Sequence, residues 1–262
     1  MELLKLATYN IRMETPDDKE DLWKNRKANV INIIENYDLD IIGLQEVKES
    51  QLRDLQKLKQ YASFGLGRSE DDGNEYNSIL YKKEKFDLIE SDTFWLSETM
   101  QLEEKEKRWN ADCPRICTWG KFQVRESGEE FYIFNTHFDH KSEEARYQSA
   151  KLIMDKLEAL DCPVAVMGDL NGEPHERLYR IFAGNLRDAV RESKYHVGPL
   201  KTCTGTGFNH RLGWDEYHQI DYIFVNRYFN IHKTEVITDK FDGRYPSDHF
   251  PVLLHTSIGG SD

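Results

Sequence analysis

Five short apolar segments of this 262-residue chain end in side chains that could take part in acid–base or metal chemistry. Core strands usually end in turn residues, but the side chains here are acids, amides and imidazoles: Asn10, Glu46, His137, the pair Asp169 and Asn171, and the pair Asp248 and His249. A buried carboxylate is unfavourable unless it is paired or bound to a metal. Oxygen donors without cysteine are the ligands of a hard cation. The pattern therefore predicts a Mg²⁺ or Mn²⁺ site where several strands end.

Residues 168–174, GDLNGEP, form one of the two more specific signals. Asp169 and Asn171 are two positions apart, so in an extended backbone their side chains point the same way. Gly168 and Gly172 allow the close backbone turns that would direct both side chains into a cleft. Since a turn needs only one Asp or Asn, the second polar residue favours a functional site.

Residues 247–252, SDHFPV, form the other signal. Asp248 and His249 are adjacent, so on a strand they would face opposite sides. One could then serve a metal, and the other a substrate or an acidic partner. Upstream, Asp221 in QIDYIFV opens another apolar strand and is a candidate for that partner.

Each of these residues also has a structural interpretation when taken alone. An isolated Asn10 is typical of a turn. Glu46 could cap the helix that follows it, and His137 could be a structural histidine. Only the complete set favours a metal site.

Short apolar runs bounded by turn residues predict a strand-rich fold. The predicted strands are Leu3–Ile11, Asp40–Gln45, Ser78–Tyr81, Thr118–Val124, Phe131–Thr136, Pro163–Met167, Gln219–Val225 and Phe250–His255. Runs such as IIGL and VAVM are apolar throughout, which is typical of strands buried on both faces.

Helical spacing of apolar residues predicts two helices, Trp23–Glu35 and Ser142–Leu160, the second with a Ser N-cap. No linker or low-complexity block divides the chain. We therefore expect one α/β domain over residues 1–262, with mixed sheets and outer helices. The charged stretch Leu102–Trp109 is predicted to be an exposed loop.

The composition limits the classes of partner. Against 47 Asp and Glu there are 35 Lys and Arg, a formal net charge of −12. A chain this acidic is a poor non-specific binder of long nucleic acid, but its charge does not exclude a phosphate substrate.

The four cysteines lack zinc or redox spacing, so we expect reduced thiols. We see neither a leader nor a membrane-spanning run, and we expect a cytoplasmic monomer that does not act at a membrane.

The motifs TYNIR, LQEV, NTHFDH, GDLNGEP, IDYIFV and SDHFPV occur in this order between Thr8 and Leu254. As an ordered set they resemble the endonuclease/exonuclease/phosphatase superfamily, which is DNase I-like. The segments PRICTW and FNTHFDH are most similar to those of uncharacterised bacterial members. The resemblance implies a four-layer sandwich, in which two mixed sheets pack face to face with helices outside. It also implies a metal-dependent phosphoric ester hydrolase with its site at one end of the sheets.

The resemblance assigns a metal side and a water side to this site. It implies that Glu46 is the direct ligand of Mg²⁺ or Mn²⁺ and that Asn10 belongs to both the metal and the phosphate site. Asp248 is implied as a second metal-side carboxylate. Asp169 is implied as the general base that deprotonates the attacking water, and Asn171 as its companion, which holds the water or a phosphate oxygen.

The resemblance also implies a phosphate side. His249 is expected to contact the phosphate while Asp221 orients it and favours its cationic form. His137 is expected to protonate or hydrogen-bond the leaving group, with Glu75 as its carboxylate partner. Arg115, in PRICTW, is implied as a phosphate-binding arginine.

Three interpretations of the substrate stay open. The first is a phosphodiesterase or nuclease that acts on nucleotides or short single-stranded ends, in the manner of a 3′–5′ exonuclease. The second is a phosphatase or phosphodiesterase for a sugar, inositol or lipid-headgroup phosphate, and the third is a non-catalytic binding protein. Phe208, Trp214 and Tyr217 could stack a base or simply pack a long loop. Residues 203–219 differ from similar bacterial chains and leave the substrate contacts unspecified.

Overall fold

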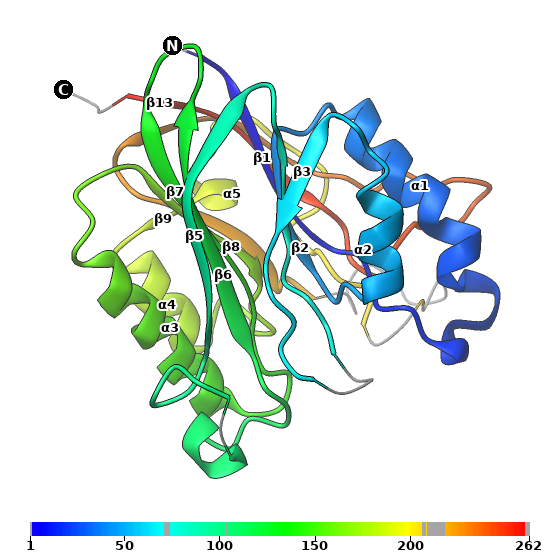
Figure 1. The fold of residues 1–262 in the computed structure, drawn as a ribbon, viewed down its shortest axis with the longest axis horizontal. Coiled ribbons are helices and arrows are strands. Elements are labelled where there is room, and N and C mark those ends of the chain that lie inside the picture. Colours follow the sequence, from blue (N-terminus) through cyan, green and yellow to red (C-terminus); the bar gives the residue numbers. More distant parts are fainter. Residues whose placement is uncertain (1, 71–73, 103, 206–207, 209–217, 260–262) are drawn as a thin grey trace.

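Two β-sheets packed face to face form the centre of the computed structural model, which describes residues 2–70, 74–102, 104–205, 208 and 218–259 (Figure 1). The first sheet has the strand order β10 (His196–Val197), β12 (Phe229–Val236), β13 (Val252–Ile258), β1 (Leu4–Asn10), β2 (Ile41–Gln45), β4 (Ile79–Lys82) and β3 (Tyr61–Phe64). The second has the order β5 (Phe86–Trp95), β6 (Ile116–Val124), β7 (Glu130–His137), β8 (Val164–Asp169), β11 (Asp221–Val225) and β9 (Arg187–Asp188).

Both sheets are mixed. The pairs β1–β2, β10–β12 and β7–β8 are parallel, and their other pairs are antiparallel. Helices cover the outer faces, which completes four layers (Figure 1). The helical elements are η1 (Pro16–Asp21), α1 (Trp23–Asn36), α2 (Glu49–Leu55), η2 (Lys105–Arg108), α3 (Glu143–Leu157), α4 (Arg177–Ala183) and α5 (Ala189–Glu192). The predicted four-layer α/β sandwich is confirmed.

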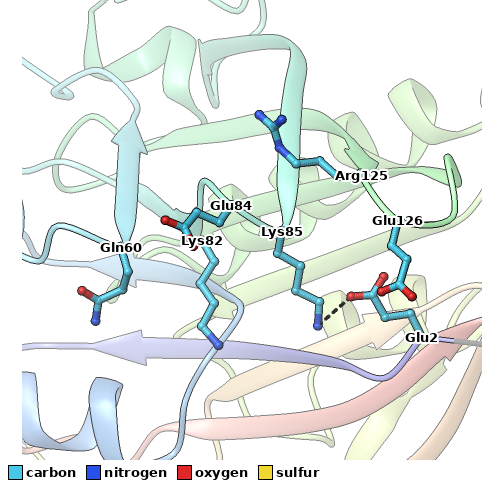
Figure 2. A pocket seen from close by; sticks show the side chains of 7 residues that line it. All are labelled: Glu2, Gln60, Lys82, Glu84, Lys85, Arg125 and Glu126. Carbon is cyan, nitrogen blue, oxygen red and sulfur yellow. Dashed lines mark ion pairs between the residues drawn. The ribbon is translucent and has the colours of Figure 1, made fainter.

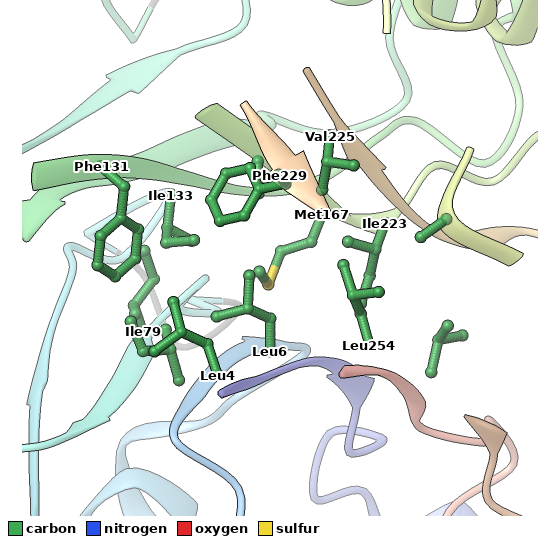
Figure 3. Close-up of a cluster of buried hydrophobic side chains, with 14 of the residues drawn as sticks. Leu4, Leu6, Ile79, Phe131, Ile133, Met167, Ile223, Val225, Phe229 and Leu254 are labelled. Carbon is green, nitrogen blue, oxygen red and sulfur yellow. The ribbon is translucent and has the colours of Figure 1, made fainter. Parts of the chain in front are cut away.

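Alternation along the strands divides the apolar side chains between the layers. Leu4 and Leu6 of β1 point into the core between the sheets, where Met167 of β8 meets them (Figure 3). Ala7 and Tyr9, on the opposite face of β1, instead pack with α1 on the outer side of the sheet. This is the period of two that a strand imposes, and it explains why β1 carries apolar side chains on both faces.

A buried polar connection joins the two sheets near the carboxyl ends of β1 and β2. The side chain of Gln45 donates from Nε2 to Thr8 Oγ1 at 3.0 Å and to Asn135 Oδ1 at 2.7 Å. Asn135, on β7 of the other sheet, donates from Nδ2 to the carbonyls of Leu44 at 2.9 Å and Ser78 at 3.1 Å. These bonds fix one sheet relative to the other.

The predicted strands and helices agree with the structure except at some boundaries, but the stretch predicted as an exposed loop, Leu102–Trp109, contains the short helix η2. Ser142 caps α3 and accepts from the Ala145 amide at 3.1 Å, as expected, but the helix ends at Leu157 rather than Leu160. The strand β5 was not predicted, because its middle, residues 89–92, is polar or exposed and lacks an apolar alternation. Among the described residues, no helix combines the length and apolar character that crossing a bilayer requires.

Candidate active site

The register of the strands brings several of the predicted residues together at one edge. Between β7 and β8, His137 pairs with Asp169, and between β8 and β11, Asp169 pairs with Asp221. On the facing sheet, Asn10 ends β1 and Glu46 directly follows β2. The carboxyl ends of parallel neighbours lie at the same edge, so both sheets present their polar residues to one place.

A cleft of about 700 Å³ opens at this edge. The predicted residues that line it are Glu46, Glu75, Arg115, His137, Asp169, Asn171, Asp248 and His249. Asn10 and Asp221 are buried and contact the lining residues through hydrogen bonds. The structure therefore gathers all ten of the sequence-predicted site residues around one cleft.

Asn10 is the link between the carboxylates of the two sheets. Its Nδ2 atom donates to Glu46 Oε1 at 3.1 Å and to Asp169 Oδ2 at 3.0 Å. Its own Oδ1 accepts from the Arg12 amide at 3.0 Å. Asn10 is fully buried, so its amide has one fixed orientation and sets the separation of the two acids.

The donors at this point fit a hard divalent cation. One atom each of Glu46, His137 and Asp169 lies within 4.8 Å of the others. Burial raises the pKa of Glu46, but His249, Arg12 and the amide of Met13 outweigh it and leave the pKa below its usual value. Glu46 is thus held as a carboxylate, with Oε2 accepting from the Met13 amide at 3.1 Å. A carboxylate fixed in this way is suited to metal binding.

Asp248 lies across from Glu46 in the cleft. Oε2 of Glu46 and Oδ2 of Asp248 are each 3.9 Å from Nη1 of Arg12. Burial raises the pKa of Asp248, His249 opposes this, and the negative charge of Glu46 adds to the rise. Two neighbouring buried acids of this kind become compatible when a cation lies between them.

Asp169 occupies the middle of the cleft. Its Oδ2 is 3.4 Å from Nε2 of His137 and 3.8 Å from Nε2 of His249, and its Oδ1 accepts from the Asn171 amide at 2.9 Å. Burial, followed by the charge of Asp221, raises the pKa of Asp169 to about 7, against the opposing effect of His249. A carboxyl group with such a pKa can accept and release a proton near neutrality.

His249 is held by a buried carboxylate. Nδ1 of His249 is 2.9 Å from Asp221 Oδ2, and that oxygen also accepts from the Thr202 hydroxyl at 2.7 Å. Burial lowers the pKa of His249, but Asp221, Cys203 and Asp169 together outweigh burial and leave the pKa well above its usual value. The imidazole is therefore a cation that points Nε2 towards Asp169 and the Cys203 sulfur, 3.4 Å away.

The backbone at Asp248 and His249 differs from the prediction. The two were expected to face opposite sides of a strand, but β13 begins only at Val252 and both residues line the cleft. Ser247 holds the bend: its hydroxyl donates to the Asn10 carbonyl at 2.7 Å and accepts from the His249 amide at 3.3 Å. Strand alternation does not apply to a bent segment.

Asn171 reaches the cleft in a different way from the extended backbone that we expected. Its φ is 48°, in the left-handed region, and its Nδ2 donates to the Phe138 carbonyl at 3.0 Å. Glu46 and Arg12, with φ of 58° and 56°, are also left-handed. Such conformations cost on the order of 1–3 kcal/mol for a non-glycine residue and concentrate at functional sites.

Gly168 is required where β7 and β8 approach. Its φ is 151°, and a Cβ atom there would lie 1.9 Å from the Thr136 carbonyl oxygen. Only glycine permits this close approach, which places Asp169 directly after it in the cleft.

Comparison with known proteins agrees with this geometry. Residues 7–249 match the Endonuclease/Exonuclease/phosphatase family. The chain belongs to this family. The crystal structure of an endonuclease/exonuclease/phosphatase from Bacteroides vulgatus is 34% identical, covers 98% of this chain and 100% of its own, and has a TM-score of 0.90.

Two further relatives carry more specific names. A mannosyl-6-phosphatase of Bacteroides thetaiotaomicron VPI-5482 is 33% identical with a TM-score of 0.90, and the match covers 97% of this chain and 100% of that one. Human nocturnin is 23% identical over 270 residues, which is 90% of this chain and 58% of nocturnin. The chain thus spans less than two thirds of the length of nocturnin.

The family name and the name of this mannosyl-6-phosphatase both denote enzymes that hydrolyse phosphate esters. The ordered motifs predicted this family, and the prediction is confirmed.

One pairing expected for this family member is wrong. Glu75 was expected to bind His137, but its Oε1 lies 2.6 Å from Nη2 of Arg68. The reason is local: the Arg68 amide donates to the Glu75 carbonyl at 3.0 Å, which aligns the two loop segments. Among the described residues His137 Nδ1 has no hydrogen-bond partner. Burial, then Arg115 and Arg68, lower the pKa of His137 well below its usual value, so the imidazole is neutral.

Charged residues that sequence reasoning missed complete the walls of the cleft. Glu176 Oε2 accepts from Arg146 Nη2 at 2.6 Å, and Glu173 Oε1 lies 2.9 Å from His218 Nδ1. Asp112 Oδ2 lies 3.7 Å from His140 Nε2. These residues are not at the ends of apolar runs, so strand patterns gave no signal for them.

Of the three aromatic residues that could stack a base, the structure describes Phe208 alone. The Phe208 ring lies 5.3 Å from the Arg26 guanidinium, which favours its packing role. Trp214 and Tyr217 fall outside the described residues.

A smaller hollow of about 440 Å³ lies at the other end of the sheets, where Lys85 binds Glu2 at 3.2 Å (Figure 2). It is lined by charged residues and Gln60, and it lacks the acid–imidazole set of the cleft.

Proposed function

We propose that this chain is a Mg²⁺- or Mn²⁺-dependent phosphatase that releases phosphate from a small polar ester such as a sugar phosphate. The observation that carries the proposal is the position of Asp169. One carboxylate oxygen faces Asn10, His137 and His249, and Asn10 connects it to Glu46. A base, a cationic imidazole and a metal-binding acid thereby share one reaction space.

Asp169 would take the proton from the attacking water. Its pKa of about 7 supports this role, which is worth roughly 10²–10⁴-fold in rate. Asn171, whose amide donates to Asp169, would hold the water or a phosphate oxygen. Glu46 and Asp248 would hold the cation. Asn10 would orient Glu46 rather than bind the cation, because its Nδ2 donates to Glu46 Oε1 and its Oδ1 accepts from the Arg12 amide. When bound, this cation would neutralise part of the charge on the phosphoryl oxygens.

The imidazoles of His249 and His137 and the guanidinium of Arg115 would contact the phosphoryl group and the leaving group. His249, kept cationic by Asp221, would stabilise the negative charge that grows on the phosphoryl oxygens, and Arg115 would share that role. His137 is neutral and has an unpartnered Nδ1 among the described residues. It would hydrogen-bond the leaving oxygen through Nε2, the ring nitrogen that lies 3.4 Å from Asp169 Oδ2.

The rim of the cleft supports a small, uncharged leaving group. Glu173, Glu176 and Asp112 line it, and the chain carries a net charge of −12. The surplus of acids over the whole chain disfavours the binding of a long nucleic acid strand, and carboxylate oxygens in the cleft can accept hydrogen bonds from the hydroxyl groups of a small ester. The likeness to the mannosyl-6-phosphatase, at 33% identity over nearly the whole of both chains, supports the same choice.

A nuclease that acts on short single strands was the first interpretation of the sequence, and it becomes the alternative that an assay must separate. We also propose a monomeric, single-domain enzyme of the cytoplasm. Four free cysteines, Cys113, Cys117, Cys162 and Cys203, support that compartment.

The experiment is a substrate panel with Mg²⁺, with EDTA, and with Mg²⁺ restored. It includes hexose 6-phosphates, inositol phosphates, mononucleotides, and single-stranded RNA and DNA oligonucleotides. We expect inorganic phosphate from hexose phosphates, loss of release in EDTA, and recovery with excess Mg²⁺. Shortened oligonucleotides without release from any monoester would instead support the nuclease.

A further inference from the structure

Arg12 lies in the cleft and has no role in the proposed mechanism so far. Its Nη2 and Nε atoms bind Asp18 of η1, the closest contact being 3.1 Å. The remaining nitrogen, Nη1, is 3.9 Å from both Glu46 Oε2 and Asp248 Oδ2, which is too long for a hydrogen bond. Within the described part of the chain, Nη1 is therefore an unused donor that faces the metal-side acids.

The backbone of Arg12 is held in an unfavourable conformation by several buried partners. Its φ is 56°, and its amide donates to Asn10 Oδ1 at 3.0 Å. Its carbonyl accepts from Gln51 Nε2 at 2.9 Å and from the buried guanidinium of Arg26. A strained residue that is fixed on all sides is typical of a functional position.

The orientation of the guanidinium matches the binding of an anion. Asp18 occupies one edge of the planar fork, which fixes the plane and leaves Nη1 directed into the cleft. The Arg12 side chain is 15% exposed, so its charge is little screened by solvent. A phosphoryl oxygen next to the metal-side acids would lie within its reach.

We propose that Arg12 binds a non-bridging oxygen of the substrate phosphate, and that its charge weakens cation binding until phosphate is present. This inference rests on the proposed function, since it takes the substrate to be a phosphate ester. A fixed positive charge beside Glu46 and Asp248 opposes a second cation. Bound phosphate offsets both charges, so phosphate and metal bind with positive coupling.

The test is calorimetric and needs no turnover. Mg²⁺ is titrated into the parent and into Arg12→Ala, and inorganic phosphate is then titrated in saturating Mg²⁺. We expect Arg12→Ala to bind phosphate about 10- to 100-fold more weakly, because a charge-assisted hydrogen bond is lost. Without phosphate it should bind Mg²⁺ several-fold, on the order of threefold, more tightly. Phosphate binding by folded Arg12→Ala within about twofold of the parent would overturn the proposal.

Arg12→Lys separates charge from geometry. Lysine retains the positive charge but cannot hold Asp18 and a phosphate oxygen with one planar fork. We expect Mg²⁺ affinity near that of the parent and weaker phosphate binding. Mg²⁺ affinity that rises equally in both variants would refute the charge effect.

Controls address folding and the proposed function separately. Alanine retains a Cβ atom, so the backbone strain at Arg12 is unchanged, but Asp18 loses its partner; the double variant Arg12→Ala, Asp18→Asn removes that buried charge. Arg53→Ala, on α2 with a 65% exposed side chain, should leave both affinities unchanged. If no monoester is hydrolysed but phosphate binding still depends on Arg12, the proposed function fails and this inference stands.

Discussion

The Asp221 carboxylate lies 2.9 Å from Nδ1 of His249, and the same oxygen accepts the Thr202 hydroxyl at 2.7 Å. Thr202 Oγ1 in turn accepts from the Asp221 amide at 3.1 Å, so the carboxylate cannot rotate away from the imidazole. The relationship resembles the way in which a buried acid fixes the tautomer and charge of a catalytic histidine. The positive charge of His249 therefore depends on the folded structure that holds Asp221 beside it.

Replacing Asp221 should change how activity depends on pH. Asp221 raises the pKa of His249, so the parent keeps a cationic His249 as the pH rises through neutrality. In Asp221→Asn that pKa falls, the charge is lost first at high pH, and the basic limb of kcat/KM should move down by about one to three pH units. The measurement is kcat/KM from pH 5.5 to 9.

The matched control for this pH experiment is Glu235→Gln. Glu235 Oε1 lies 2.9 Å from Nε2 of His255, outside the cleft, and is a similar carboxylate–histidine pair. Glu235→Gln should leave the dependence of kcat/KM on pH unchanged. An equal loss at every pH in Asp221→Asn would argue that Asp221 acts only on folding.

Glu46→Gln should weaken Mg²⁺ binding with little effect on the fold. The substitution keeps the shape and the bond accepted from Asn10, but it loses the bond accepted from the Met13 amide and removes a ligand charge. We expect affinity to fall at least about tenfold in a calorimetric titration, since ligand charge is a main determinant of divalent-cation affinity. Glu49→Gln, exposed at the start of α2, is the control. Equal affinities for the parent and Glu46→Gln would remove Glu46 from the metal site.

Gly168→Ala should destabilise the sandwich and displace Asp169. The added Cβ would meet the Thr136 carbonyl at 1.9 Å, at a φ of 151°. We expect a loss of several kcal/mol, on the order of 3 or more, in the free energy of unfolding by urea. Gly128→Ala has φ of 77° but open space, so it isolates the conformational cost, roughly 1 kcal/mol. Comparable losses in the two variants would show that the clash is absent.

Asn135→Ala tests the buried connection between the sheets. It removes the bonds to Gln45, Leu44 and Ser78 and leaves their buried groups unpaired. The free energy of unfolding should fall by about 2–4 kcal/mol. Asn185→Ala, which loses one exposed bond to Ile181, should fall within about 0.5 kcal/mol of the parent. A parent-like denaturation midpoint for Asn135→Ala would contradict this role.

The sequence predicts the central strands and the site because the two are connected. Asp169 and Glu46 end or follow apolar runs that can only be buried strands, and polar residues at strand ends meet at one edge. Local patterns thus reveal which residues are near the edge. They do not reveal the bends that orient Asp248 and His249, which depend on Ser247 binding the carbonyl of Asn10.

Other features leave no pattern in the sequence. The strand β5 is half exposed and alternates poorly. The partner of Glu75 depends on backbone pairing between two loops, so Arg68 could not be recognised. Arg12 is one of many arginines, and only its left-handed backbone and its contact with Asp18 distinguish it. Each of these depends on tertiary packing.

The role of Asp169 as general base is tested by the turnover of Asp169→Asn. The variant keeps the bond with Asn10 possible but removes the base, so phosphate release from hexose phosphates should fall about 10²–10⁴-fold. Calorimetry should show Mg²⁺ and phosphate still bound, and Asp155→Asn, exposed on α3, should be fully active. Phosphate release by Asp169→Asn close to that of the parent would show that Asp169 is not the base.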